Sequence, residues 1–140
     1  MHDVYENRVR FAETDQQGVV FYGEYVTFQD EAVNGFFRAI GYDYDRMHED
    51  GWDVHVAHVD VDYRTPARFE DVIVNAMRVN RIGESSIHYD YEARRKVDGT
   101  VLAEGSVVHV AVERDGEATV RVPDAFREAV AAFQEDPPEQ

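Results

Sequence analysis

Residues 22–40 constrain the fold most, because their apolar side chains recur at intervals of three and four. Positions three and four apart lie on the same face of a helix, so this spacing predicts one long amphipathic helix. Its apolar stripe consists of Tyr25, Phe28, Ala32, Val33, Phe36, Phe37 and Ile40. Val26 widens the stripe, so we expect the helix to be covered on more than one side. Gly41 follows the last apolar position and indicates where the helix ends.

The segments around this helix have the patterns of β-strands. We expect one strand before it, at 3–11, and further strands at 54–64, 71–80, 86–95 and 100–113, with a short one at 119–122. Within 54–64 the apolar residues change phase, which predicts a bulge near Ala57 and His58. Residues 42–53 are polar and are expected to form a loop, with or without a helical turn. Pro123 suits the first turn of a final helix.

Grouped strands that follow one helix are typical of an antiparallel sheet with a helix on one face. The predicted fold class is therefore α+β, with a sheet of five to six strands wrapped around the long helix. Residues 1–134 form a single domain in this interpretation. Residues 135–140 are charged and rich in proline, and we expect them to form a flexible acidic tail.

Several classes of protein are excluded by composition. No apolar run approaches the ~20 residues that a membrane span needs, so no membrane insertion is expected. The first six residues are polar and acidic, unlike a secretory signal, which favours the cytoplasm. The chain has no cysteine, and this excludes disulfides, thiolate nucleophiles and zinc held by cysteine.

The charge of the chain is strongly negative. Asp and Glu number 29 against 14 Lys and Arg, for a net charge of −15, and Lys96 is the only lysine. A surface of this kind repels phosphates, so we expect no nucleic-acid partner. Dispersed acid with almost no lysine resembles the composition of proteins from salt-loving archaea. High salt screens self-repulsion, so the fold is predicted to weaken in low salt.

A carboxylate, Asp15, lies on a turn that contains Gly18, just before the predicted helix. The free N–H groups at a helix start attract developing negative charge, so a carboxylate beside them could act as a nucleophile or base near an oxyanion site. The alternative is that Asp15 only stabilises the turn or caps the helix. The residues alone leave both roles open.

The stretch from Asp15 through Gly18-Val19-Val20-Phe21-Tyr22 to Tyr25 resembles acyl-CoA thioesterases of the 4-hydroxybenzoyl-CoA thioesterase type, which have the hot-dog fold. The resemblance resumes at residues 62–71, and Val122-Pro123 before the last helix also fits. It implies that Asp15 is the catalytic carboxylate and that the backbone N–H near Tyr22 polarises the thioester carbonyl. Some relatives have a histidine where this chain has Tyr22, so an acid–base partner is missing here.

The same resemblance implies an acyl-CoA substrate and a homodimer or homotetramer. No cofactor is expected, and no metal, because His48, His55 and His58 do not match a His-Glu-x-x-His zinc pattern. Residues expected to contact the substrate are Gly18, Val20, Phe21, Tyr25, His58, Arg64 and Arg68. Tyr25 also lies on the apolar stripe, where a core role is the alternative. The two arginines are candidates for the CoA phosphates, together with Arg94 and Arg95, and each could instead pair with one of the abundant carboxylates.

Two other functions compete with thioester hydrolysis. A non-catalytic module that binds or senses acyl-CoA would show no turnover and would tolerate the loss of Asp15. A hydratase or dehydratase acting on an acyl thioester is less favoured, because such proteins resemble this chain but pair the Asp with a histidine where Val20 stands. Whether Asp15 would attack directly or activate water is not decided by the sequence.

Overall fold

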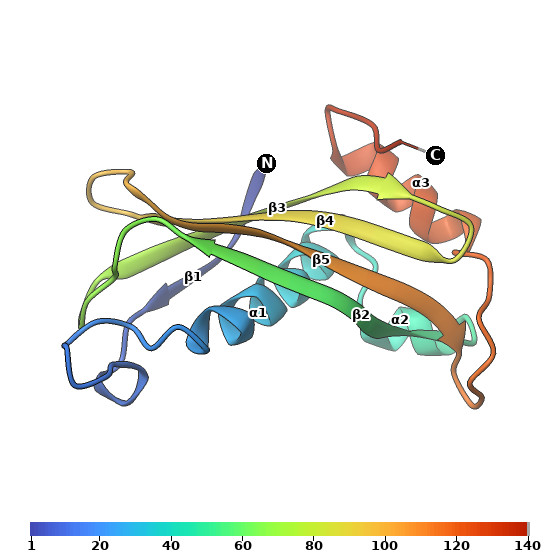
Figure 1. Ribbon diagram of the computed structural model, residues 1–140. Coiled ribbons are helices and arrows are strands. Elements are labelled where there is room, and N and C mark those ends of the chain that lie inside the picture. The colour runs from blue at the N-terminus through green and yellow to red at the C-terminus, as the bar shows by residue number, and fades with distance from the viewer. Residues whose placement is uncertain (140) are drawn as a thin grey trace.

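The computed structural model describes residues 1–139, and in these an antiparallel sheet of five strands wraps around one long helix (Figure 1). The strands are β1 (His2–Arg8), β2 (Trp52–Tyr63), β3 (Val72–Ile82), β4 (Ser86–Arg95) and β5 (Val101–Glu113). Their order across the sheet is β1-β3-β4-β5-β2, so β1 and β2 are the edges. The predicted α+β hot-dog architecture is confirmed, with five strands.

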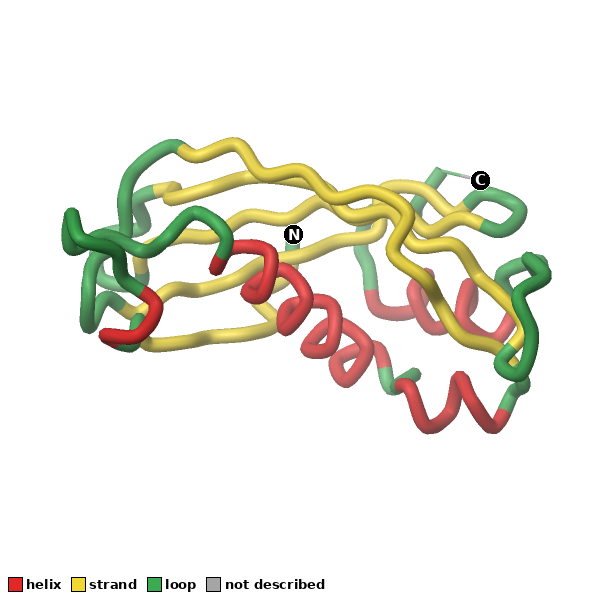
Figure 2. The backbone as a smooth tube through the Cα atoms, turned by 60° about the horizontal axis from the view of Figure 1, so that its bottom comes forward, coloured by secondary structure: helices red, strands yellow, loops and turns green. Residues whose placement is uncertain are grey.

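The long helix α1 (Glu24–Ile40) lies against the concave face of the sheet (Figure 2). Its predicted stripe is buried from Tyr25 to Phe37. The helix ends as predicted, because Gly41 adopts the left-handed conformation with φ 74°, which glycine tolerates best. Its start is two residues later than expected, because residues 22 and 23 belong to the preceding turn.

Two shorter helices complete the fold. Helix α2 (Tyr44–Glu49) occupies half of the segment expected to be a loop with or without a helical turn. The Asp43 carboxylate caps it by accepting a hydrogen bond from the Arg46 N–H at 3.0 Å. Helix α3 (Asp124–Phe133) packs on the last turns of α1, where Phe126 lies edge-to-face on Phe37. A single 3-10 turn, η1 (Phe11–Glu13), follows β1. None of the helices in residues 1–139 has the length and apolar character needed to cross a lipid bilayer.

The predicted bulge in β2 is confirmed. The register between β2 and β5 shifts between Val56 and His58, which leaves Ala57 without a partner. The extra residue reverses the alternation of side chains, so Val56 before the bulge and Val59 after it both line the same cavity. The bulge therefore lets β2 keep apolar residues toward α1 along its whole length.

The structure corrects two predicted strands. Residues 119–122 form no strand. Thr119 makes a single bridge to β5 and the Val120 N–H donates to the Ala111 carbonyl, but the Val122 N–H turns away to the Glu84 carbonyl, at the β3–β4 turn. β1 ends at Arg8 rather than residue 11, because Phe11 enters η1. In the expected tail, the Glu139 N–H donates to the Asn80 carbonyl at 2.9 Å. Residue 140 lies outside the described residues.

Candidate active site at the start of helix α1

The residues before α1 fold into a tight turn around Asp15. The Asp15 side chain accepts a hydrogen bond from the Gln17 N–H at 2.8 Å, and its backbone carbonyl accepts one from the Gly18 N–H at 3.0 Å. Gly18 has φ 77°, a conformation that costs other residues energy. The turn is closed by the Asp15 N–H, which donates to the Val19 carbonyl at 2.9 Å. Asp15 is half-buried, and these hydrogen bonds together fix its position in the turn.

The turn is attached to the rest of the protein on both sides. The Val20 N–H donates to the Ala67 carbonyl at 2.8 Å, and Val19 forms an isolated bridge with Arg68. On the other side, the Phe21 N–H donates to the Glu13 carbonyl at 2.9 Å. The chain between β2 and β3 therefore holds the Asp15 turn in place before α1 begins.

Two backbone N–H groups at the start of α1 are unpaired. Within residues 1–139, neither the Tyr22 nor the Gly23 N–H has a hydrogen-bond acceptor, whereas the next N–H, of Glu24, donates to the Phe21 carbonyl. Free N–H groups at the positive end of a helix dipole are suited to hold an oxyanion. The sequence places Asp15 seven residues before Tyr22, and the bridge between Thr14 and Val20 folds this segment back on itself.

A pocket of about 210 Å³ opens beside this helix start. It is lined by Val19, Val20, Tyr22, Tyr25, Tyr63, Arg64, Thr65 and Pro66. Burial raises the pKa of Tyr25 to about 12, so its phenol is neutral at ordinary pH and cannot serve as a base there. Tyr22 is 66% exposed.

The structure brings together some of the residues predicted from the sequence and separates others. Val20, Tyr22, Tyr25 and Arg64 line the pocket at the helix start. Asp15 and Gly18 form the adjoining turn, and Phe21 stacks on Tyr22 with ring centroids 4.4 Å apart. Arg68 and His58 are not among the lining residues.

The predicted substrate contacts His58, Arg64 and Arg68 differ in their surroundings. His58 is mostly exposed and lies 3.1 Å from the Asp60 carboxylate. Arg64 pairs with Glu104 at 3.2 Å. Arg94 and Arg95 are also paired with carboxylates, of Asp3 and Asp98 respectively. Arg64, Arg94 and Arg95 therefore form surface ion pairs, which was the alternative to binding the CoA phosphates. Arg68 has no ion pair among the described residues.

Sequence reasoning missed Tyr63, whose hydroxyl donates to the Tyr22 carbonyl at 2.9 Å. The phase change in β2 was the signal that could have found it, because it turns Tyr63 toward the helix. It also missed Gln29 and His109, which are buried and line a second cavity between α1 and the sheet. In residues 1–139, no group of three or more His, Asp or Glu side chains is arranged to hold a metal ion.

The fold and the turn before α1 define a hot-dog protein, and comparison with known proteins gives its family. A model of the thioesterase-like superfamily matches residues 9–130. The chain belongs to this superfamily.

Relatives and solved structures are similar to the chain over nearly its whole length. The chain is 21% identical over 126 residues to a 1,4-dihydroxy-2-naphthoyl-CoA hydrolase of Synechococcus elongatus, covering 89% of this chain and 91% of that protein. A hypothetical protein of Thermus thermophilus has 29% identity and a TM-score of 0.85, covering 95% of this chain and all of that one. A Pseudomonas aeruginosa protein has 30% identity and a TM-score of 0.81, covering 96% of this chain and 92% of that one.

Proposed function

We propose that this protein hydrolyses acyl-CoA thioesters to the free acid and CoA, with Asp15 as the catalytic carboxylate. The observation that carries the proposal is the position of Asp15 on a fixed turn that leads directly into unpaired N–H groups of a helix start. Membership of the thioesterase-like superfamily and the similarity to a dihydroxynaphthoyl-CoA hydrolase support the reaction class.

The reaction needs a polarised carbonyl, a nucleophile and a leaving group. The Tyr22 and Gly23 N–H groups would bind the thioester oxygen and stabilise the negative charge that develops on it. Asp15 would either attack the carbonyl carbon, forming a mixed anhydride that water cleaves, or accept a proton from the water that attacks. In both routes the carbon–sulfur bond breaks and CoA leaves as a thiolate. A thiolate leaves readily, so the neutral Tyr25 need not supply a proton.

A second copy of the chain would complete the site. β2 is an edge strand of 12 residues, and no other strand of residues 1–139 pairs with its outer side. Such an edge favours pairing with another strand. Tyr63 of β2 is 50% exposed, which is apolar surface that a partner would cover. We infer a homodimer or homotetramer, and light scattering that gives a monomer under conditions of full activity would contradict this part.

The phosphates of CoA would be bound by arginine. Arg68 is exposed and has no carboxylate partner among residues 1–139, whereas Arg64 is shared with Glu104. Arg68 also bridges Val19 in the Asp15 turn through its backbone, which keeps it near the proposed site. On a surface this acidic, an unpaired arginine is the favoured contact for an anion.

The test is release of the CoA thiol by the wild-type protein and by Asp15→Asn. The amide keeps the size of the side chain and can still accept from the Gln17 N–H, but it is no longer a base or a carboxylate nucleophile. Turnover is expected to fall by about a hundredfold or more. Asp62→Asn, on exposed β2, serves as the matched control and should keep its activity.

Folding and ligand binding must be measured on the same variants. Unchanged circular dichroism and thermal midpoint for Asp15→Asn would show that the loss is chemical. Full activity in folded Asp15→Asn would remove Asp15 from the mechanism. Binding of acyl-CoA by the wild-type protein without any thiol release would instead support the non-catalytic module. Single-turnover hydrolysis in heavy-oxygen water, followed by the mass of the Asp15 peptide, separates attack by Asp15 from activation of water.

A further inference from the structure

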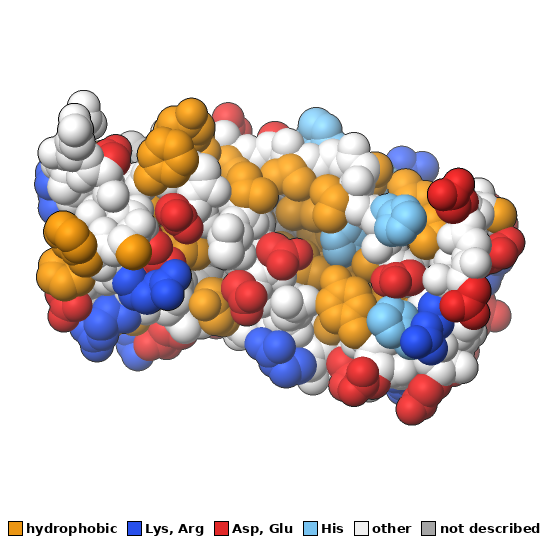
Figure 3. Space-filling view, turned by 90° about the horizontal axis from the view of Figure 1, so that it is seen from below, with side chains coloured by type: hydrophobic (Ala, Val, Ile, Leu, Met, Phe, Trp, Pro, Cys, Tyr) orange, Lys and Arg blue, Asp and Glu red, His pale blue; other side chains and the backbone are white. Residues whose placement is uncertain are grey.

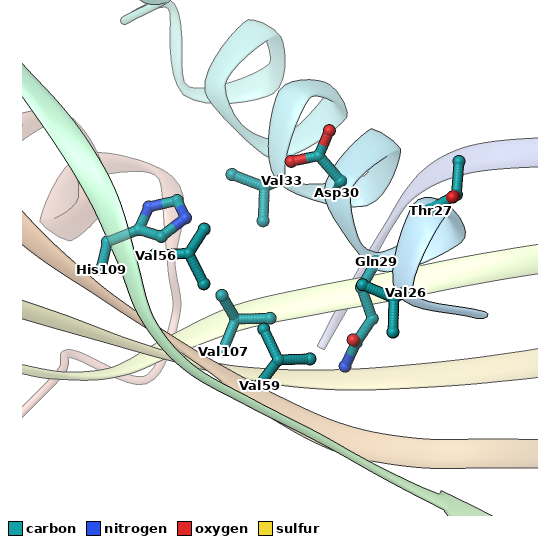
Figure 4. Close-up of a pocket in the computed structure, with 9 residues that line it drawn as sticks. All are labelled: Val26, Thr27, Gln29, Asp30, Val33, Val56, Val59, Val107 and His109. Atoms are coloured by element: carbon teal, nitrogen blue, oxygen red, sulfur yellow. The ribbon is translucent and has the colours of Figure 1, made fainter. Parts of the chain in front are cut away.

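A second cavity, of about 240 Å³, lies between α1 and the strands β2 and β5 (Figure 4). Valine side chains from all three elements form most of its wall, including Val33, Val56, Val59 and Val107. An apolar cavity of about 150 Å³ is enough for a benzene ring, so this one has room for a compact organic group. Figure 3 shows the same face of the molecule, with a hollow among hydrophobic side chains and acidic residues around it.

Gln29 lies at one end of this cavity and has an unused acceptor. Its Nε2 donates to the Asp60 carbonyl at 3.1 Å, which fixes the amide and leaves Oε1 buried with no hydrogen-bond partner in residues 1–139. Gln29 also packs closely on Gly105 of β5, since a Cβ at that position would lie only 3.0 Å from Nε2. Gln29 is 1% exposed, so water does not freely reach this oxygen.

His109 lies at the other end and is also unsatisfied. It is 2% exposed, and its Nδ1 is buried with no partner among the described residues. Its ring is wedged between the rings of Phe37 and Tyr89, at centroid distances of 6.4 and 5.2 Å. Burial lowers the pKa of His109 to about 4, only partly offset by Asp53, so the imidazole is neutral and has one donor and one acceptor nitrogen.

Two buried polar groups without partners are costly, and each costs more than the hydrogen bond it lacks would gain. A trapped water would need two to four polar partners, and apart from Thr27 and Asp30 of α1 the rest of the wall is valine. We propose that Gln29 and His109 are specificity-determining residues, which select an acyl group that carries a hydroxyl within its apolar part. This inference rests on the proposed thioesterase function.

The cavity is placed to receive the acyl group. Val26, on its wall, lies in the first turn of α1, four residues after Tyr22. A thioester whose carbonyl lies at the Tyr22 N–H can therefore extend along α1 into the cavity. The hydroxyl then donates to Gln29 Oε1 or pairs with His109, depending on where it stands in the acyl group. Asp30 at the rim is exposed and negative, which disfavours an acyl group that ends in a carboxylate.

The experiment compares matched acyl-CoA pairs that differ by one hydroxyl. Hydroxyhexanoyl-CoA is compared with hexanoyl-CoA, and ring-hydroxylated benzoyl-CoA with benzoyl-CoA, each with the hydroxyl at several positions. We expect kcat/KM to favour the hydroxylated member of at least one pair by roughly tenfold or more, because a site built to bond a hydroxyl rejects the analogue that lacks it. Gln29→Met or His109→Leu should abolish that preference, so that the two members of the pair have similar kcat/KM.

Gln134→Met is the matched control for loss of a buried amide. The Gln134 side chain bonds both the N–H and the carbonyl of Val79, at 2.7 and 2.9 Å, away from this cavity. It should lower stability and leave the hydroxyl preference intact. A thermal unfolding curve for each variant shows that the protein compared is folded, and the His109→Leu variant provides the answer if Gln29→Met does not fold.

Binding separates this inference from the function on which it rests. Calorimetry with non-hydrolysable thioether analogues of the same pairs needs no turnover, so tighter binding of a hydroxylated analogue would support the inference even if the protein proved not to hydrolyse thioesters. Equal binding and equal kcat/KM within every pair would overturn it while the thioesterase assignment stands. The Gln29→Met variant could also change the oligomeric mass and leave the hydroxyl preference intact. That result would mean that a second copy fills the cavity in place of the acyl group, and it would overturn the inference.

Discussion

The hydroxyl of Tyr63 donates a hydrogen bond to the backbone carbonyl of Tyr22, 2.9 Å away. This contact joins the edge strand β2 to the last residues before α1. The Tyr63 ring also lies edge-to-face on Tyr25, with centroids 5.5 Å apart. Burial raises the pKa of Tyr63, with a smaller contribution from Tyr22, so the hydroxyl stays a donor at neutral pH. The carbonyl it holds belongs to the residue whose N–H we propose as the oxyanion donor.

Tyr63→Phe is therefore predicted to affect activity more than stability. The ring contact with Tyr25 remains, but the peptide before α1 loses an anchor, and small misplacements at a reacting centre are costly. We expect kcat to fall several-fold and the free energy of unfolding to fall by about 1 kcal/mol or less, because the bond is solvent-exposed. Thiol release and urea titration measure the two quantities.

The control for this substitution is Tyr5→Phe. The Tyr5 hydroxyl has no hydrogen-bond partner among the described residues, so its removal should change neither kcat nor stability noticeably. Equal losses of kcat in the two variants would mean that the Tyr63 hydroxyl has no special role at the helix start.

Much of this fold follows from local patterns in the sequence. The three-and-four spacing from Tyr25 to Ile40 depends only on one helix and one buried face, and Gly41 marks the end of that helix by its backbone freedom. The bulge at Ala57 is likewise visible as a change of phase within one strand. The expected strand at 119–122 failed because the chain leaves β5 after Val120, and nothing local says that the Val122 N–H bonds Glu84 instead of β5.

The site was less predictable, because it is assembled from segments far apart in the chain. Asp15 could be singled out by its place before the helix, whereas Tyr63 and Pro66 reach the pocket only through the pairing of β2. The sequence does show Gln29 as a polar residue next to Phe28 on an otherwise apolar stripe, which could have indicated a buried polar group at the site. That its oxygen lacks a partner is a property of the packed structure and has no sequence counterpart.

A buried chain of hydrogen bonds supports α2 and predicts a stability effect. The Trp52 Nε1 donates to the Tyr42 hydroxyl at 3.0 Å, and that hydroxyl donates to the Asp50 carboxylate at 2.5 Å. Tyr42→Phe leaves the indole N–H buried without an acceptor, since both aromatic residues are nearly inaccessible. The free energy of unfolding should fall by about 1–3 kcal/mol.

Trp52→Phe together with Tyr42→Phe tests the cause of that loss. The double variant removes both the indole N–H and the hydroxyl that accepts from it, so no buried N–H is left unpaired. Its loss of unfolding free energy should therefore be smaller than the sum of the losses in the two single variants. Chemical denaturation followed by far-ultraviolet circular dichroism, which does not require the tryptophan, gives the free energy of unfolding of all three variants. Strict additivity would show that the Trp52–Tyr42 bond does not contribute.

His109 predicts a specific sensitivity to acid. Its pKa is about 4 in the folded protein, below its ordinary value of about 6.5, so between these values the unfolded chain binds the proton and the folded chain does not. Stability from this residue is complete above about pH 6.5 and is lost as the pH falls toward 4. The difference of roughly 2.5 pH units corresponds to about 3 kcal/mol.

The measurement is the free energy of unfolding of wild type and His109→Leu between pH 7 and pH 4. Carboxylates protonate in both proteins, so the difference between the two curves isolates the imidazole. Wild type should lose about 3 kcal/mol more than the variant over this range. Parallel curves would contradict a buried neutral His109, as would a histidine resonance that titrates near pH 6.5 at this position.

The strongly negative charge of the chain predicts that its stability depends on salt concentration. Surface ion pairs such as Arg64–Glu104 are weakened by salt, but each contributes little, whereas repulsion within a net charge of −15 acts on the whole fold. Raising the salt from 0.1 M to 1 M shortens the Debye length from about 10 Å to about 3 Å. The thermal midpoint should therefore rise with potassium chloride and level off near 1 M.

A triple variant, Asp115→Asn, Glu117→Gln and Glu135→Gln, checks that repulsion is the cause. These exposed carboxylates have no ion pair among residues 1–139, so their neutralisation removes negative charge and breaks no attraction. The variant should be more stable than wild type in 0.1 M salt, and the two should converge in molar salt, where the repulsion is screened. A gap between them that does not close, or a wild-type midpoint that is flat or falls with salt, would show that the acidic surface does not make this fold dependent on salt.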